Sequence, residues 1–223
     1  MALLDVVLPA RCAACGAGET LFCSACRYAL LRIRPPLCTR CGAPTAWPVE
    51  RCAECAGRRI PFRHARAAVA YEGAARALVA AWKERGLRRL AGEAASLVAE
   101  TVSRPTVAAI AYVPGDPERT RWRGQNTAQA LAAELAARWD LPLVDVLVRA
   151  RPVRRQPGLP RQERRANVRG SFRTVAEPPR TVVLVDDVYT TGATAAAVAT
   201  ELRRAGARAV DVVTFARAIL RAA

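Results

Sequence analysis

The chain has 223 residues, of which 52% are apolar, and its 35 lysine and arginine residues outnumber 19 acidic residues, so the net charge is +16. This length suits one moderate domain and a small one, and no run approaches the 18 apolar residues of a membrane-spanning helix, so we expect no membrane span. The charge favours polyanionic partners such as nucleic acid or phosphorylated metabolites. Lys83 is the only lysine, and such an arginine bias can also reflect genome base composition.

The first 60 residues contain all eight cysteines, arranged as four Cys-x-x-Cys pairs. Residues 1–9 show no secretory signal, so we expect a cytoplasmic protein whose cysteines bind metal rather than form disulfides. Each pair can direct two sulfurs at one ion, and two pairs complete a tetrahedral zinc site with Zn–S distances of about 2.3 Å. We therefore predict a double zinc ribbon over residues 1–60 that holds two structural zinc ions.

The way in which the cysteine pairs combine has two solutions. Sequential pairing is favoured, and crossed pairing stays open. A closed site of four cysteines leaves no position for catalysis, and a redox role for a single pair lacks the βαβ context of such motifs. With sequential pairing, the ligands of one zinc are Cys12, Cys15, Cys23 and Cys26, and those of the other are Cys38, Cys41, Cys52 and Cys55.

Residues 67–223 alternate between short apolar runs and helical patterns. Such alternation predicts an α/β domain with a parallel sheet and helices on its faces. Strands are expected over 67–71, 107–113, 143–148, 182–185 and 210–215, and helices over 74–83, 90–102 and 195–205, with one more ending at 139.

The segment 149–173 carries nine arginines against one acidic residue. Its length and composition predict a mobile basic loop. An ordinary solvated surface is one interpretation, while its place in one domain with a phosphate loop favours a lid or groove wall for a polyanion. Its candidate anion contacts are Arg154, Arg155 and Arg161, and three more arginines, Arg119, Arg121 and Arg123, precede a predicted helix.

The most informative stretch is residues 182–194. An apolar run typical of a strand buried on both faces is followed by Asp186 and Asp187, at the end where open α/β sheets bind ligands. The next residues are Thr190, Thr191, Gly192, Ala193 and Thr194. Small hydroxyl residues and glycine at a helix start expose N–H groups to an anion. A bare turn is the alternative, but sugar acceptors followed by phosphate donors favour a sugar-phosphate site.

This stretch closely resembles the ribose-phosphate signature of type I phosphoribosyltransferases. The resemblance implies that Asp186 and Asp187 bind ribose hydroxyls and that residues 190–194 hold the 5′-phosphate. It also implies a phosphoribosyl-type small molecule as ligand, with Mg²⁺ bound mainly through substrate oxygens. The three arginines before the helix would then meet the diphosphate.

Further motifs extend the resemblance to nearly the whole chain. They are the paired cysteines after residues 3–9, Tyr71-Glu72-Gly73, Trp82-Lys83, Arg123-Gly124-Gln125-Asn126, and the series Arg149, Gln156, Glu163-Arg164, Asn167-Val168 and Gly170-Ser171-Phe172. In this order they are similar to the ComF family of competence-associated proteins, which includes the GntX-like proteins. The family implies a zinc ribbon joined to a phosphoribosyltransferase-like domain, and a role with incoming single-stranded DNA and the DNA-uptake machinery. Gln125 and the segment after Pro114 depart from the usual family residues.

Two functions follow from this interpretation. An enzyme would move ribose 5-phosphate from its diphosphate donor to a nucleophile, or a binding protein would reuse the fold to grip single-stranded DNA. Trp122, Phe172 and Tyr189 are the candidate base-stacking residues. Release of diphosphate would indicate the enzyme, and salt-dependent DNA binding without turnover would indicate the binding protein. A regulator that only senses the ribosyl donor is a third, weaker interpretation.

Overall fold

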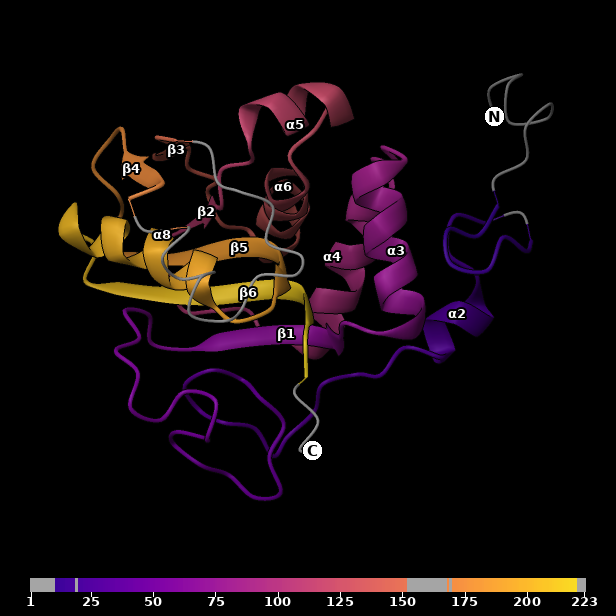
Figure 1. The fold of residues 1–223 in the computed structure, drawn as a ribbon, viewed down its shortest axis with the longest axis horizontal. Coiled ribbons are helices and arrows are strands. Elements are labelled where there is room, and N and C mark those ends of the chain that lie inside the picture. The colour runs from indigo at the N-terminus through magenta and orange to yellow at the C-terminus, as the bar shows by residue number, and fades with distance from the viewer. Residues whose placement is uncertain (1–10, 19, 152–167, 169, 220–223) are drawn as a thin grey trace.

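A four-stranded parallel sheet forms the centre of the computed structural model, which describes residues 11–18, 20–151, 168 and 170–219 (Figure 1). The strand order across the sheet is β1-β6-β5-β2. The strands span Ala65–Ala70 (β1), Ala109–Tyr112 (β2), Thr181–Tyr189 (β5) and Ala209–Arg217 (β6). Most of their residues are buried, as expected for a parallel sheet that helices cover on both faces.

Helices cover the two faces of this sheet. α3 (Gly73–Glu84) leads into α4 (Leu90–Thr101), which packs with α6 (Thr127–Trp139) on one face. α8 (Ala193–Arg204) joins β5 to β6 and lies on the opposite face, in front of the sheet in Figure 1. Helix-containing connections between parallel strands produce this arrangement, and the predicted α/β class is confirmed. Among the described residues, no helix is long and apolar enough to cross a membrane.

The predicted strand over 143–148 does not become a full strand of the main sheet. Leu143 makes a single parallel bridge to Ile110 of β2. β3 (Leu147–Arg149) instead pairs antiparallel with β4 (Phe172–Thr174), and this small hairpin was not predicted. The predicted basic loop therefore begins and ends in strands.

A short helix after β2 was also not predicted. α5 spans Pro117–Arg123. The Asp116 side chain caps its start by accepting a hydrogen bond from the Arg119 backbone N–H at 3.1 Å, and Pro117 at its first position lacks only an N–H that would otherwise be unpaired. This helix places three arginines at the carboxyl edge of the sheet.

The two cysteine segments lie on different sides of the α/β core (Figure 1). The first ends in the short helix α2 (Ser24–Tyr28) and lies beside α3 and α4. The second, residues 38–55, lies along β1, the outer strand of the sheet. The chain between them follows β1 as well, since the Ile33 N–H donates to the Ala68 carbonyl at 2.9 Å.

Candidate functional site

The two carboxylates lie inside β5, because its pairing with β6 continues as far as Tyr189. On the other side of β5, the neighbouring strand β2 ends at Tyr112, opposite Val185. Asp186 and Asp187 therefore stand just beyond the end of β2, in the position where open α/β sheets bind their ligands. Because successive residues of a strand face opposite sides, the two carboxylates point to different faces of the sheet.

The Asp187 side chain is held by two residues from the helices α3 and α6. Lys83 Nζ donates to Asp187 Oδ1 at 2.6 Å, and the Thr127 hydroxyl donates to the other carboxylate oxygen. Burial opposes the charge on Lys83, but the Asp187 carboxylate raises the pKa of Lys83 above its ordinary value. Both partners come from the ends of helices, Lys83 from the last turn of α3 and Thr127 from the first residue of α6. The Asp187 carboxylate therefore has a cation and a hydroxyl donor as partners, one on each of its oxygens.

Asp186 faces a different environment. Desolvation by the surrounding protein and the neighbouring Asp187 charge raise the pKa of Asp186 to about 7, while Lys83 and Arg149 act in the opposite direction. The backbone N–H of Asp187 donates to Asp186 Oδ1 at 2.9 Å. Asp186 therefore titrates near neutral pH. Once it has lost its proton, its carboxylate can accept a hydrogen bond from a hydroxyl group or bind a cation.

The loop after β5 has the backbone conformation that the predicted anion site requires. Gly192 adopts φ +71°, a left-handed conformation that only glycine takes readily, and it caps α8. The Thr191 hydroxyl accepts a hydrogen bond from the Ala193 N–H at 3.3 Å. The first residues of α8, which form the positive end of the helix, line the hollow beside Asp186.

This hollow has a volume of about 230 Å³, including its solvent-open part. Its lining combines one carboxylate with the hydroxyl and backbone groups of the loop and one threonine of β6. The lining residues are Asp186, Val188, Tyr189, Thr190, Gly192, Ala193, Thr194, Ala195 and Thr214. The structure thus brings four of the five predicted loop residues, Thr190, Gly192, Ala193 and Thr194, together with Asp186. Thr191 does not line the hollow, and Asp187 faces Lys83 on the other side.

The predicted arginines occupy the same edge of the sheet. Arg121 is exposed on α5, and Arg119 and Arg123 are half-buried. Arg149, in β3, is an additional cation that the predictions did not place in the site. Its Nη2 donates to the Pro114 carbonyl at 3.1 Å, and its guanidinium lies 4.9 Å from the centre of the Phe172 ring.

Arg149 also interacts electrostatically with both sides of the site. Burial lowers the pKa of Arg149, the Asp116 and Asp186 charges act in the opposite direction, and Arg119 adds to the lowering. These contacts place cations on the diphosphate side of the predicted site. The other predicted anion contacts, Arg154, Arg155 and Arg161, lie outside the described residues.

The eight cysteines gather into two groups of four in the predicted sequential pairing, which excludes the crossed arrangement. The groups are Cys12, Cys15, Cys23 and Cys26, and Cys38, Cys41, Cys52 and Cys55, and within each group the sulfur atoms all lie within 4.8 Å of one another.

The sulfur positions fit a tetrahedral zinc ion. Zn–S bonds of about 2.3 Å imply sulfur–sulfur distances of about 3.8 Å. The observed distances are 3.7 Å for Cys15–Cys23, 3.6 Å for Cys38–Cys55 and 3.5 Å for Cys41–Cys52. Backbone N–H groups also donate to the sulfurs, for example Cys52 N–H to Cys38 Sγ at 3.4 Å. Both groups are closed four-cysteine sites suited to structural zinc.

Sequence reasoning did not assign Lys83 or Thr127 to the site. Lys83 is 104 residues from its partner Asp187, and Thr127 is 60 residues from it. The one available signal was that Lys83 is the only lysine of an arginine-rich chain. A residue type that occurs once offers a candidate but no partner, because the partner depends on how α3 packs against β5.

Comparisons with known proteins agree with these features. Residues 3–56 match the double zinc ribbon domain family. The chain is 31% identical over 209 residues to the DNA utilization protein YhgH of Salmonella typhimurium, a match that covers 88% of this chain and 90% of the relative. It is 34% identical to Competence protein F of Haemophilus influenzae over 142 residues, which cover 61% of this chain and 62% of that relative, less than two thirds of its length.

Among solved structures, the chain is similar to orotate phosphoribosyltransferase from Aeropyrum pernix. The identity is 24%, the match covers 66% of this chain and 67% of that one, and the TM-score is 0.33. A TM-score this low does not by itself assign a fold.

Proposed function

Because the chain belongs to the ComF family of competence-associated proteins, we propose that it binds a phosphoribosyl-type ligand and acts in DNA uptake or in related nucleotide metabolism. The observation that carries the proposal is the hollow at the carboxyl edge of β5, where Asp186, Thr190 and residues 192–194 face the same space. A sugar phosphate requires this combination of acceptors and donors within a few ångströms.

Each end of such a ligand has a counterpart in the hollow. The ribose hydroxyls would donate to Asp186, with Asp187 held behind it by Lys83. The 5′-phosphate would accept from the N–H groups and hydroxyls of the loop. Arg119 and Arg149 would meet a diphosphate group, since both lie on the α5 and β3 side. Mg²⁺ bound with the ligand would neutralise diphosphate charge, mainly through ligand oxygens.

As an enzyme, the protein would transfer ribose 5-phosphate to a nucleophile and release diphosphate. The residues of the chain would contribute by holding the sugar at Asp186 and by stabilising the negative charge that develops on the leaving diphosphate. Incubation with phosphoribosyl diphosphate, Mg²⁺ and a panel of nucleobases, followed by measurement of diphosphate, tests this step. Binding without release would leave the ligand-binding proposal and exclude transfer to the bases tried.

Calorimetry with phosphoribosyl diphosphate, with and without Mg²⁺, tests the binding itself. We expect a dissociation constant below millimolar for the unchanged protein and a large loss of affinity for Gly192→Val. The side chain of valine would resist the positive φ and fill the turn. No binding of the donor at millimolar concentration by the unchanged protein would contradict the proposal.

A second function, binding of single-stranded DNA, is favoured by one exposed aromatic residue. The Trp122 side chain on α5 is 74% exposed, and Arg121 and Arg123 flank it in the sequence. Bases stack on such a ring while cations contact the backbone. We expect Trp122→Ala to weaken DNA binding without changing the salt slope. Neutralising Arg154, Arg155 and Arg161 should reduce that slope by just under one unit for each lost phosphate contact.

A further inference from the structure

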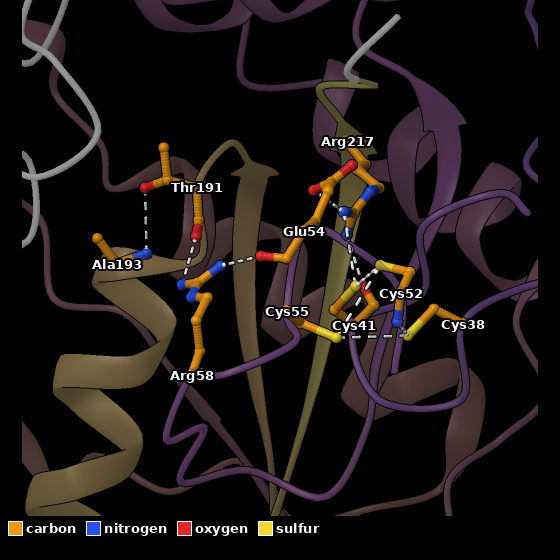
Figure 2. Close-up of polar contacts among 9 residues, drawn as sticks. All are labelled: Cys38, Cys41, Cys52, Glu54, Cys55, Arg58, Thr191, Ala193 and Arg217. Carbon is orange, nitrogen blue, oxygen red and sulfur yellow. Dashed lines mark hydrogen bonds and ion pairs between the residues drawn. The ribbon is translucent and has the colours of Figure 1, made fainter. Parts of the chain in front are cut away.

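We propose that the second cysteine cluster, Cys38, Cys41, Cys52 and Cys55, is a structural part of the anion-binding loop, and that Arg58 and Arg217 are the positioning residues that join the two. Figure 2 shows Arg58 between the loop and Glu54, and Arg217 beside the cluster on the other side of Glu54. Zinc bound by these cysteines would then help to set the affinity of residues 190–194 for a phosphate group. Only this last consequence depends on the proposed function.

Arg58 is the direct connection. Its Nη2 donates to the Thr191 carbonyl at 2.9 Å, and its Nη1 donates to the Glu54 carbonyl at 3.1 Å. Glu54 lies between Cys52 and Cys55, so the guanidinium bridges the ribbon and the loop. A carbonyl fixed in this way orients the peptide that leads into Gly192, and therefore the N–H groups that follow it.

Arg217 makes the second connection, from the end of β6. Its guanidinium donates to the Cys41 carbonyl and, at 2.7 Å, to the Glu54 carboxylate. It also lies 4.7 Å from the centre of the Tyr189 ring. The side chain is only 1% exposed. A buried guanidinium needs these partners, so it cannot move without moving the ribbon.

Tyr189 transmits this position to the loop. It is buried at the end of β5, and its hydroxyl lies where a side chain at Gly192 would have to be. The ring is also packed edge-on against Phe62, with the ring centres 6.5 Å apart. A continuous series of contacts therefore runs from Cys41 through Arg217 and Tyr189 to Gly192.

The first cysteine cluster makes its contacts elsewhere and provides the control. Arg85, which follows α3, donates to the Ala13 carbonyl at 2.7 Å. Arg27 donates to Glu93 of α4 at 3.2 Å. Arg85 is thus the matched counterpart of Arg58: each is an arginine that reaches a backbone carbonyl between a cysteine segment and the α/β domain.

Hydrogen exchange tests the connection without any ligand. In the full-length, zinc-loaded protein, we expect Arg58→Met and Arg217→Met to speed exchange of the backbone amides of residues 189–195 by about fivefold, the effect of one lost hydrogen bond. Arg85→Met should leave these amides unchanged. Metal analysis must give the same zinc content for all variants. Exchange at the unchanged rate in Arg58→Met and Arg217→Met would overturn the proposal.

Zinc affinity provides a second, reciprocal readout. If zinc at the second cluster favours phosphate binding, phosphate must raise the zinc affinity of that cluster by the same factor. At equilibrium with a competing chelator, we expect phosphoribosyl diphosphate to raise the affinity for one of the two zinc ions about fivefold, for a coupling near 1 kcal/mol, and Arg58→Met to abolish this protection. Binding of the donor without protection would contradict the inference alone. Absence of donor binding would contradict the proposed function, and hydrogen exchange would still decide the inference.

Discussion

The two cysteine clusters have the same ligands and the same Cys-x-x-Cys spacing, but they are built into the molecule differently. The first is attached to the helical side of the domain through Arg27 and Arg85. The second is attached to the end of β6 and to the loop after β5 through Arg217 and Arg58. One cluster therefore fixes a peripheral segment, and the other connects the N-terminal region to the predicted ligand site.

The comparison teaches that cysteine spacing predicts a metal site but not its neighbours. The spacing determines which sulfurs can reach one ion. The surroundings depend on residues that follow the clusters in the chain, such as Arg58, and on partners far away, such as Thr191, which is 133 residues from it. A structural zinc site can thus serve a distant loop without any sign of this in its own motif.

Removing one ligand from each cluster is the strongest test of this difference. We expect Cys15→Ser and Cys52→Ser each to bind one zinc ion instead of two, since structural zinc contributes on the order of 10 kcal/mol of apparent binding free energy. The thermal midpoint should fall further for Cys52→Ser, because loss of its cluster also frees the buried Arg217. Zinc analysis and calorimetric melting measure both effects. Equal midpoints would contradict the comparison.

The sequence predicted the sheet better than its edges. The apolar run 182–185 identified β5 correctly, but the strand continues to Tyr189 because β6 supplies partners for the next residues, such as Thr214 opposite Asp186. A search for apolar runs cannot detect these strand pairs, since two of the added residues, Asp186 and Asp187, are acidic. The small hairpin of β3 and β4 was missed for the same reason, because it depends on a pairing across the arginine-rich segment.

The second prediction examines whether α3 and α6, which hold Asp187, also support the candidate site. Among the described residues, Lys83→Met leaves the buried Asp187 carboxylate with Thr127 as its one side-chain partner. Breaking a buried ion pair costs several kcal/mol, and since the Lys83 side chain is 28% exposed we expect a loss of about 2–3 kcal/mol. Urea denaturation measures the loss, with Lys83→Arg as the charge-preserving control.

Arg85→Met can also contradict the comparison between the two clusters. Lys83 and Arg85 stand two residues apart at the end of α3, so the first cluster has an indirect path to Asp187. If Arg85→Met changed donor affinity as much as Arg58→Met, both clusters would support the site. We expect no such change, because Arg85 contacts the ribbon and not the carboxylate.

The third prediction concerns Gly192, whose φ is +71° and whose missing side chain leaves room for the Tyr189 hydroxyl. Gly192→Ala should cost about 1–2 kcal/mol through the left-handed backbone alone. It should also displace Tyr189 and speed zinc release from the second cluster only. Chelator kinetics distinguish the two clusters if Cys15→Ser is used to remove the first. If the rate of zinc release is unchanged in Gly192→Ala, the loop is not coupled to the second cluster.

The candidate site residues that the sequence suggests form one contiguous motif, whereas those that the structure adds do not. Residues 186–194 run from the end of β5 through a short loop into the start of α8, so one short stretch describes all three. Lys83, Arg149 and Arg217 approach this stretch from three other elements. Their positions follow from the packing of α3, β3 and β6, which no local pattern encodes.

The smallest effect is expected from Asp186, which touches neither cluster. Its pKa is raised to about 7, mainly by desolvation. A raised pKa favours the protonated carboxyl in the folded chain, so this group destabilises the fold by an amount that grows from the ordinary aspartate pKa of 3.8 up to about pH 7 and is constant above it. The ionised form accepts hydrogen bonds from ribose, and its fraction grows about tenfold between pH 6 and pH 8. Donor affinity should therefore rise by up to that factor over this range.

Asp186→Asn provides the matched control, since the amide oxygen can still accept the hydrogen bond from the Asp187 N–H. The variant should be more stable than the unchanged protein at pH 8, by a smaller margin at pH 5, and nearly equal to it only below the ordinary aspartate pKa of 3.8. Its donor affinity should keep only the pH dependence that the phosphate groups of the ligand themselves cause. Calorimetric titrations at both ends of the range measure the difference. An identical pH profile for the two proteins would mean that Asp186 does not contact the ligand, and that the loop held by the second cluster provides the affinity by itself.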